Sequence, residues 1–418
     1  MRSLIDSEGS KQPTSTARFW GLPKNVFFLG FVSLLTDLSS EVAIRTLPLF
    51  LANVLGIKAS VIGLIEGVAD STATLTRLLS GWLSDRLGKR KVLVTTGYGL
   101  STFVKPVLYF ATSWWHILIV RFLDRVGKGV RTAPRDALIA DSCTPAERGR
   151  AFGFNKAMDP AGAMAGLAVA AVIVYFSQGG SLGLTRLTYH YLVLLAVIPA
   201  LLSFLLLVAF VRDVAPVTKS LDTMPDADGR VLNPNFKRYL AVLIFFTLGN
   251  SSDAFLMLRA QNLGMSIGEI FALLAVFNLV SAVCSYPAGR LSDRLGRKSL
   301  ISAGWLIYAG VYLGFAVATS AAHVWALYLI YGVYEGLTAG VEKAFVADLV
   351  PGHVRGTAYG FYNTAIGISA LPASLIAGVL WQAISPPAPF VFGAALAFAG
   401  FIGLNVMVKK GPQASQPQ

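Results

Sequence analysis

The sequence predicts an all-α membrane protein with twelve transmembrane helices in two pseudo-symmetric six-helix bundles. Three observations lead to this fold class. The 418-residue chain is 55% hydrophobic, and its mean hydropathy is +0.62. Only 14% of its residues are charged, against about 25% in an ordinary soluble domain. Sequence fragments also recur at nearly one offset in the two halves. This composition argues against a soluble enzyme, a disordered chain and a secreted disulfide scaffold.

The helices are expected where apolar runs lie between charged, glycine or proline breaks. A bilayer core about 30 Å thick needs about 20 apolar residues in a helix, so roughly a dozen spans use almost the whole chain. The expected spans are residues 25–54, 60–83, 92–112, 115–141, 150–177, 190–211, 237–261, 267–288, 299–319, 323–349, 356–383 and 388–408. The longest connection is rich in Asp, Pro and Thr, and it separates six helices from six.

Five parts of the chain follow from these spans. They are a cytoplasmic N-terminal tail at 1–24, a six-helix bundle at 25–211, a cytoplasmic linker at 212–236, a second six-helix bundle at 237–408 and a cytoplasmic C-terminal tail at 409–418. The first 20 residues lack an apolar segment, which predicts that there is no cleavable signal peptide.

The orientation follows from the distribution of lysine and arginine in the loops. With both termini in the cytoplasm, the outer loops hold only Lys58 and Arg186, as the positive-inside rule requires. We therefore expect a multi-pass protein of a bacterial cytoplasmic or inner membrane. The same asymmetry explains most of the formal net charge of +13, so no nucleic-acid partner is expected.

The two halves of the chain share sequence motifs. Residues 81–91 read GWLSDRLGKRK and residues 289–299 read GRLSDRLGRKS, at an offset of 208. Residues 148–154 (RGRAFGF) and 355–361 (RGTAYGF) are 207 apart, and so are Asp141 and Asp348. Six helices per half make the two repeats parallel in the membrane. Two such bundles facing each other across a midplane site have the geometry of alternating access.

With these motifs the whole chain resembles the major facilitator superfamily. Residues 81–90 are similar to the superfamily's signature loop, G-x-L-a-D-r-x-G-r-k, and residues 289–298 repeat it. The resemblance implies a transporter that is not an enzyme, that needs no cofactor and that is a monomer by default.

In the superfamily, charge pairs at this loop resemble a latch for the outward-facing state. By this resemblance Arg86 and Arg90 would pair with Asp141, and Arg294 would pair with Asp348. Gly81 and Gly88 would permit the tight turn between helices. The alternative is that these charges only set the topology. The expected gating residues are Gly81, Asp85, Arg86, Gly88, Arg90, Asp141, Gly289, Asp293, Arg294, Gly296, Arg297 and Asp348.

The helix at 115–141 is also similar to the superfamily pattern R-x-x-Q-G-x-G. Arg121 and Gly127 match it, whereas Asp124 replaces the amide and Arg125 replaces the first glycine. Residues 159–166 partly match the glycine- and proline-containing helix of drug antiporters. The resemblance is therefore closest to the drug/proton antiporter-like branch, and it implies a role for Arg121 in proton coupling.

Many charged residues fall inside the expected spans, where each costs at least about 2.5–3.5 kcal/mol at the bilayer centre. Asp37, Glu41 and Arg45 are spaced by four residues, which predicts one helix face. The fourth helix carries a basic stripe: Arg121, Asp124, Arg125, Lys128, Arg131 and Arg135. Since lipid would exclude such stripes, we expect them to face one another or a water-filled cavity.

Two functional interpretations of these charges remain open beside static pairing, such as Arg121 with Glu66 or Asp37. In one, a carboxylate takes up and releases a proton, because burial favours the neutral acid and a nearby arginine favours the carboxylate. In the other, arginines bind an anionic solute through paired hydrogen bonds. The proton-coupling candidates are Asp37, Glu41, Glu66, Asp70, Arg121 and Asp124. The substrate-binding candidates are Arg45, Arg125, Asn155, Asp159, Asn250, Asp253, Arg259 and Glu335.

The expected function is proton-coupled export of a small organic compound by a secondary active transporter. The alternative is uptake or exchange of an organic anion, a carboxylate or phosphate ester, bound by intramembrane arginines. The partners are a small solute, protons and the lipid bilayer. No metal site is expected, because Cys143 and Cys284 have no metal-ligand spacing. Two rival classes are a lipid-modifying membrane enzyme and a ligand-binding receptor without flux.

Overall fold

The computed structural model of the protein describes residues 18–87, 89–143, 148–179, 181–214, 233–350 and 355–409. Within these ranges the chain forms twelve long helical segments, three of which are interrupted. The segments of the first half are α1 (Lys24–Ala43) continued by α2 (Leu47–Asn53), α3 (Ala59–Leu87), α4 (Arg90–Val104) continued by the 3-10 helix η1 (Lys105–Phe110), α5 (Trp114–Asp141), α6 (Arg148–Gln178) and α7 (Arg186–Phe210). The segments of the second half are α8 (Pro234–Gly249) continued by α9 (Asp253–Asn262), α10 (Ile267–Leu295), α11 (Arg297–Val317), α12 (Ala321–Leu349), α13 (Arg355–Ala383) and α14 (Ala388–Met407).

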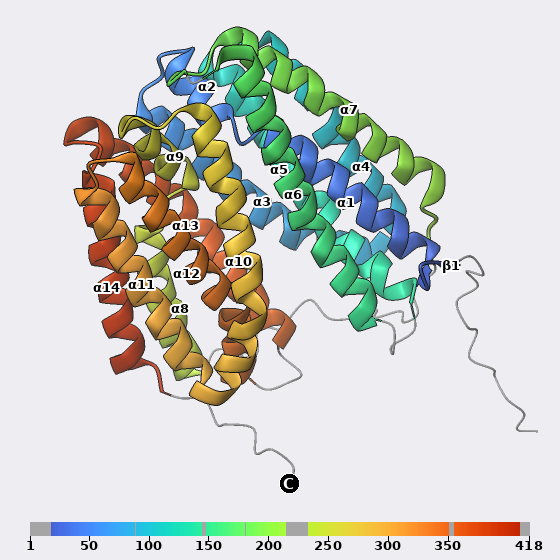
Figure 1. The fold of residues 1–418 in the computed structure, drawn as a ribbon. Helices are drawn as coiled ribbons and strands as arrows, with labels where there is room; N and C mark the ends of the chain where they lie inside the picture. The colour runs from blue at the N-terminus through green and yellow to red at the C-terminus, as the bar shows by residue number, and fades with distance from the viewer. Residues whose placement is uncertain are drawn as a thin grey trace, which may run out of the picture.

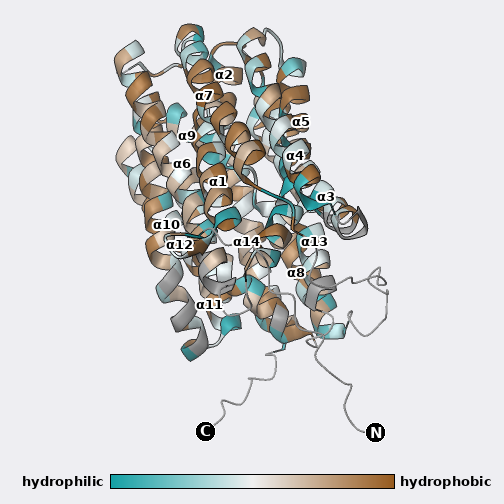
Figure 2. Ribbon diagram, turned by 90° about the vertical axis from the view of Figure 1, so that its right-hand side faces the viewer, coloured by the Kyte–Doolittle hydropathy of each residue, from teal (hydrophilic) through white to brown (hydrophobic). Residues whose placement is uncertain are grey.

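The fold is that of an all-α membrane protein, which confirms the predicted fold class. In the described ranges, nine helical segments are long and apolar enough to cross a membrane. Large apolar side chains are exposed along the helices, for example Ile198 on α7 at 62% and Val406 on α14 at 79%. A soluble protein would bury most such groups, so these faces suit contact with lipid. Figure 2 shows hydrophobic colour along most of the helices, with hydrophilic residues around α3 and at the helix ends.

The two halves of the chain form two bundles that lie side by side (Figure 1). They contact each other through α3 against α13 and through α6 against α10. A Cβ atom on Gly67 of α3 would lie 2.9 Å from the Cα atom of Leu371 on α13, so only glycine permits this approach. Nearby, the Ser71 hydroxyl donates a hydrogen bond to the Gly367 carbonyl at 2.5 Å. Because α10 repeats α3 and α13 repeats α6, the interface has an approximate two-fold symmetry.

The bundles converge at one end of the molecule and separate toward the other (Figure 1). We call the end that carries α2 and α9 the α2–α9 end, and the opposite end, where α1 begins and α14 finishes, the terminal end. At the α2–α9 end the Gln261 amide donates to Asn53 Oδ1 at 2.9 Å and to the Leu182 carbonyl at 2.6 Å. Since Gln261 belongs to the second half and its acceptors to the first, these bonds hold the halves together there.

The first span of each half is broken, contrary to the continuous spans expected at 25–54 and 237–261. The first break lies between α1 and α2, where the Ser40 carbonyl accepts the N–H groups of both Ile44 (2.7 Å) and Arg45 (3.3 Å). The second break lies between α8 and α9, and Ser252 caps α9 there with its side chain. Polar residues mark both breaks in the sequence, Arg45-Thr46 in the first and Asn250-Ser251-Ser252 in the second, but they were included in continuous spans. Broken helices of this kind expose backbone groups beside a cavity.

A short antiparallel hairpin precedes α1. Its strands are β1 (Arg18–Phe19) and β2 (Leu22–Pro23), within the segment expected as an N-terminal tail. Trp20 and Gly21 turn the chain with positive φ angles of 51° and 73°. This hairpin is a small addition to the all-α prediction, and it leaves the bundles unchanged.

Candidate functional site

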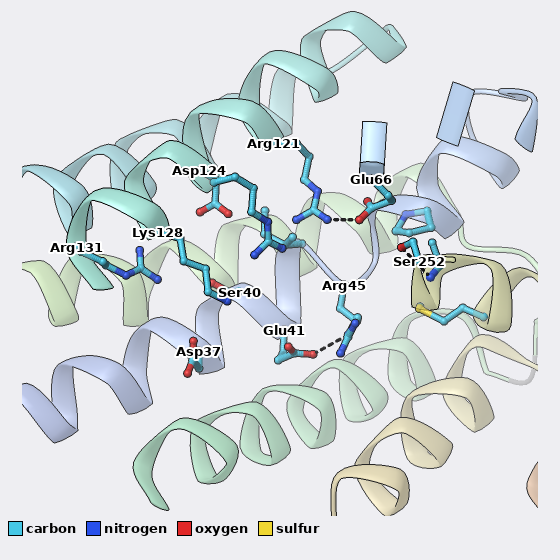
Figure 3. Close-up of a pocket in the computed structure, with 15 residues that line it drawn as sticks. Asp37, Ser40, Glu41, Arg45, Glu66, Arg121, Asp124, Lys128, Arg131 and Ser252 are labelled. Carbon is cyan, nitrogen blue, oxygen red and sulfur yellow. Dashed lines mark hydrogen bonds and ion pairs between the residues drawn. The ribbon is translucent and has the colours of Figure 1, made fainter. Parts of the chain in front are cut away.

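A cavity of about 240 Å³ lies mainly in the first half, beside the first break (Figure 3). Charged side chains dominate its lining, as the sequence predicted for the intramembrane stripes. The second half contributes only the first residues of α9 and its cap. The residues that line the cavity are Asp37, Ser40, Glu41, Ile44, Arg45, Pro48, Glu66, Arg121, Asp124, Arg125, Lys128, Arg131, Ser252, Ala254 and Met257.

The basic wall of the cavity comes from α5. Its charged residues recur every three or four positions from Arg121 to Arg131, so they share one helix face. That face lies opposite α1, which contributes Asp37, Ser40 and Glu41 (Figure 3). Gly129 lets α5 pack closely on α3, because a Cβ atom there would lie 2.6 Å from Thr76 Cβ.

Arg121 and Glu66 form an ion pair between α5 and α3. Both side chains are almost completely buried, with 4% and 6% of their surface exposed. This is the static pairing that the sequence left open. The pair is nevertheless incomplete, because Glu66 Oε1 and two Arg121 nitrogens are buried without a hydrogen-bond partner in the described chain. Such orphaned groups are uncommon in proteins and mark a place where a ligand or water would bind.

A second chain of polar contacts joins the two halves. Arg45 Nε donates to Glu41 Oε2 at 3.1 Å, and Arg45 Nη1 lies 3.5 Å from Asp253 Oδ2. The other Asp253 oxygen accepts a bond from the Tyr331 hydroxyl at 3.3 Å. Arg45 lies beyond the end of α1 rather than on its continuous face as expected. The break therefore turns this arginine toward the second half.

Three cations of the cavity have no ion-pair partner among the described residues, namely Arg125, Lys128 and Arg131. Arg131 is held differently, since its Nη1 donates to Ser101 Oγ at 2.7 Å and its guanidinium lies over the Tyr98 ring at 4.4 Å. In the described lining, five side chains are basic and four are acidic. With Arg45 and Arg121 already paired, the unpaired positive charge lies along the middle of α5.

Two carboxylates of the lining, Asp37 and Asp124, also have no ion pair within 4 Å in the described chain. Asp124 is 4% exposed and lies among cations of α5, together with Lys105 of η1. Asp37 is partly exposed on α1 and faces the same stripe, with Lys128 and Arg131 among its electrostatic neighbours. Among the described residues, neither acid is held in a salt bridge.

The sequence analysis missed Lys105, a fully buried residue at the start of η1. Its Nζ atom donates to Ser39 Oγ at 2.8 Å and to Ser40 Oγ at 3.1 Å, both on α1. The signal was available, since Lys105 falls inside an expected span and meets the criterion that selected the other charges. Ser40 carried no such signal, because a serine in a span is unremarkable until its neighbours are known.

Arg259, a substrate-binding candidate, lies outside the lining of this cavity. It is buried at the α2–α9 end, where Nε donates to the Phe315 carbonyl at 3.1 Å and Nη2 to the Ala318 carbonyl at 2.9 Å. The cation thereby satisfies carbonyl groups at the end of α11, where an arginine is electrostatically favoured. Sequence spacing alone cannot distinguish such a cap from a ligand-binding arginine.

Other substrate-binding candidates also lie outside the lining. Asn250 lies in the second break and accepts a bond from the Tyr308 hydroxyl at 3.1 Å. Asp159 on α6 lies 3.7 Å from Arg135 Nη1. Asn155 is buried on α6, and Glu335 lies on α12, one turn from Tyr331. Asp70, a proton-coupling candidate, lies one turn beyond Glu66 on α3 and is likewise outside the lining.

The expected gating residues form two equivalent pairs near the terminal end. Arg90 is paired with Asp141 and also donates to the Ala137 carbonyl at 2.9 Å. In the second half it is Arg297, not Arg294 as expected, that is paired with Asp348, at 2.5 Å. Arg297 is 207 residues from Arg90, whereas Arg294 points to an exposed surface.

In the signature loop, Gly81 does not form part of the expected turn, because it lies inside α3, as its copy Gly289 lies inside α10. Gly296, the copy of Gly88, makes the turn in the second half, with a φ of 89° that favours glycine. Gly88 lies outside the described residues. The side chains of Asp85, Arg86 and Asp293 also lie outside the described part of the structure, so their pairing stays a prediction.

Comparisons with known proteins agree with the membrane-protein fold. The model of the Major Facilitator Superfamily matches residues 29–259 and again residues 239–418. An uncharacterised MFS-type transporter of Methanocaldococcus jannaschii is 37% identical over 384 residues, which cover 90% of this chain and 93% of that protein. The class C tetracycline resistance protein of Escherichia coli is 33% identical over 139 residues, 32% of this chain and 33% of that protein.

Among solved structures, the nucleoside transporter NupG has a similar fold, with a TM-score of 0.79 and 11% identity over 92% of this chain and 100% of that one. The matched family, the relative from Methanocaldococcus jannaschii and NupG are all described as transporters, and none of them is described as an enzyme. The chain therefore belongs to the Major Facilitator Superfamily and is a multi-pass membrane transporter of small solutes.

Proposed function

We propose that the protein carries a small organic solute with an anionic group, a carboxylate or phosphate ester, and that it couples this transport to protons. The observation that carries the proposal is the unpaired positive charge of Arg125 and Lys128 in a polar cavity. A cavity of about 240 Å³ suits a small solute. Guanidinium and ammonium groups that form no salt bridge within the protein bind carboxylate or phosphate oxygens well.

We propose that Asp37 and Asp124, the two lining carboxylates that form no salt bridge with a described residue, carry the protons. Asp37 is the first candidate of the two. A proton on Asp37 removes one negative charge beside Lys128. The stripe then attracts an anion more strongly, so proton and solute bind cooperatively. Because Asp37 lies on α1 and the cations lie on α5, rocking of the helices changes their interaction in each cycle.

The topology of the proposal follows the positive-inside rule. We place the terminal end in the cytoplasm of a bacterial-type cell, the linker at 212–236 on the same side, and the monomer as the working unit. The bundles separate toward this end (Figure 1), so the conformation corresponds to an inward-facing state of an alternating-access cycle.

A second candidate is proton-coupled export of a small organic compound that has no anionic group. The partial similarity to a tetracycline resistance protein supports it, although only a third of each chain is matched. The two candidates differ in the charge of the solute, and the same experiment separates them.

The experiment is uptake into liposomes that contain the purified full-length protein. Radiolabelled succinate, glycerol 3-phosphate, tetraphenylphosphonium and glucose represent the anionic, cationic and neutral classes. We expect transport of an anion, and we expect Arg125→Gln or Lys128→Gln to raise its half-saturating concentration about tenfold or more. Lys156→Gln is the matched control, because Lys156 is exposed on α6 outside the cavity lining. Transport of only the cation or neutral compound would favour the second candidate.

A further inference from the structure

Lys105 carries a buried ammonium group that forms no ion pair with the described charged residues of the cavity. Its side chain is 0% exposed, and in the described part of the chain no carboxylate lies within 4 Å of it. Two serine hydroxyls of α1 are its hydrogen-bond partners. A buried charge without a counter-ion is costly, which makes a purely structural role for this lysine expensive.

Two of the three ammonium hydrogens of Lys105 bond to serines, and the hydrogen of one of these serines has no assigned acceptor. An ammonium group has only donors, so the oxygens of Ser39 and Ser40 both accept from it, and each serine keeps one hydrogen to donate. Ser39 is fully buried and donates to the Ala196 carbonyl at 2.6 Å. The Ser40 hydroxyl has no acceptor among the described residues, and Ser40 lines the cavity opposite α5 (Figure 3). Its hydrogen is therefore available to a ligand.

We propose that Ser40, polarised by Lys105 behind it, donates a hydrogen bond to an anionic oxygen of the transported solute. This inference rests on the proposed function and adds the contact on the α1 side of the solute, opposite Arg125 and Lys128. Ser40 touches the solute, whereas Lys105 is a positioning residue that remains behind the cavity wall. The positive charge of Lys105 strengthens the serine as a donor, because charge-assisted networks reinforce one another.

The same contact links the solute to the break in the first span. The Ser40 carbonyl accepts the N–H groups of Ile44 and Arg45, the last turn before the chain changes direction. Lys105 itself begins η1, where the third span changes from α-helix to 3-10 helix. The ammonium thus ties together two irregular segments at the cavity wall, and it fixes the direction of the Ser40 hydroxyl.

The test measures the Kd of succinate and of glycerol 3-phosphate for the full-length protein in detergent, in the wild type and in variants. We expect Ser40→Ala and Lys105→Met each to raise the Kd about tenfold. Ser40→Thr retains the hydroxyl and should stay within about twofold of the wild type. Ser39→Ala is the matched control, because Ser39 accepts from the same ammonium but donates to the protein backbone.

The affinities of the variants either support or contradict the proposed contact between Ser40 and the solute. Equal losses in Ser39→Ala and Ser40→Ala would overturn it, since both serines would then serve only to hold the lysine. The double variant of Ser40→Ala with Lys105→Met should bind no more weakly than either single variant, because Lys105 acts through Ser40. Losses of affinity that add in the double variant would contradict this. If thermal unfolding shows that Lys105→Met does not fold, the three variants Ser40→Ala, Ser40→Thr and Ser39→Ala still test whether Ser40 contacts the solute.

Failure of the proposed function is distinguishable from failure of this inference. If the wild-type protein and Arg125→Gln both bind neither probe, the solute is not anionic. The proposed hydrogen bond from Ser40 to an anionic oxygen is then wrong as well. Binding that is lost in Arg125→Gln but retained in Ser40→Ala would keep the anionic class and overturn only the hydrogen bond from Ser40.

Discussion

Arg45 Nη1 lies 3.5 Å from Asp253 Oδ2, so the break in the first span contacts the start of α9 across the interface between the halves. The two side chains are 28% and 38% exposed, and the same arginine also binds Glu41. This contact joins the cavity to the end at which the bundles converge. A rocking motion that opens the α2–α9 end has to break it.

Asp253→Asn should therefore shift the population toward a state open at the α2–α9 end. A partly exposed pair contributes about 0.2–1 kcal/mol, so we expect a change of about 1.4- to fivefold in the population ratio. The measurement is the distance distribution between spin labels at Lys58 and Gln382, which lie at this end in different halves. Glu269→Gln, an exposed carboxylate at the same end, is the control, and an unchanged distribution would leave Arg45–Asp253 without a gating role.

The Arg121–Glu66 pair makes a different prediction, because both side chains are almost completely buried. Glu66→Gln leaves the buried arginine without its counter-ion, which costs about 3–5 kcal/mol. Thermal unfolding in detergent should show a large loss of stability. Replacing both residues, Arg121→Met with Glu66→Met, should restore most of it. A double variant as unstable as the single one would show that the pair is held by more than its own charges.

The close contact between the halves predicts a strong effect of one methyl group. In Gly67→Ala the new Cβ atom would lie 2.9 Å from Leu371 Cα and 3.0 Å from its carbonyl oxygen, and neither backbone atom can move alone. We expect transport to fall severely while solute binding in the cavity persists. Gly310→Ala is the control, since nothing lies within 4 Å of its added Cβ. Normal transport in Gly67→Ala would contradict tight packing of α3 on α13.

The two pairs at the terminal end predict an unequal response. Asp141 has 11% of its side chain exposed and Asp348 has 34%, so the first pair is the better shielded. Asp141→Asn should lower the unfolding temperature more than Asp348→Asn, because removing the carboxylate from a better buried ion pair costs more. Equal shifts in the two variants would indicate that burial does not set the strength of these pairs.

Part of this arrangement could be predicted from the sequence. The internal repeat predicts two equivalent bundles, and the offset of 207 that relates Asp141 to Asp348 also relates Arg90 to Arg297. The spacing of charges on α5 predicts the basic wall of the cavity, since helical periodicity fixes which residues share a face. These predictions need only local geometry.

The rest depended on contacts that local patterns do not encode. Arg45 and Arg259 look alike in the sequence, yet the break after α1 turns one toward the cavity, whereas the other caps α11. Arg45, Thr46 and Pro48 lie close to the break, but they do not fix the residue at which α1 ends. The role of Ser40 depends on Lys105, 65 residues away, and only the packing of α1 against η1 brings them together.

The central claim is that transport of an anionic solute moves protons through Asp37. The most direct measurement places the full-length protein in liposomes that enclose a pH-sensitive dye and imposes a gradient of succinate or glycerol 3-phosphate. We predict solute-dependent proton movement in the wild type and in Glu269→Gln. The same gradient should move no protons in Asp37→Asn, although labelled solute still exchanges. Proton movement that persists undiminished in Asp37→Asn, or anion flux without any proton movement in the wild type, would contradict the account.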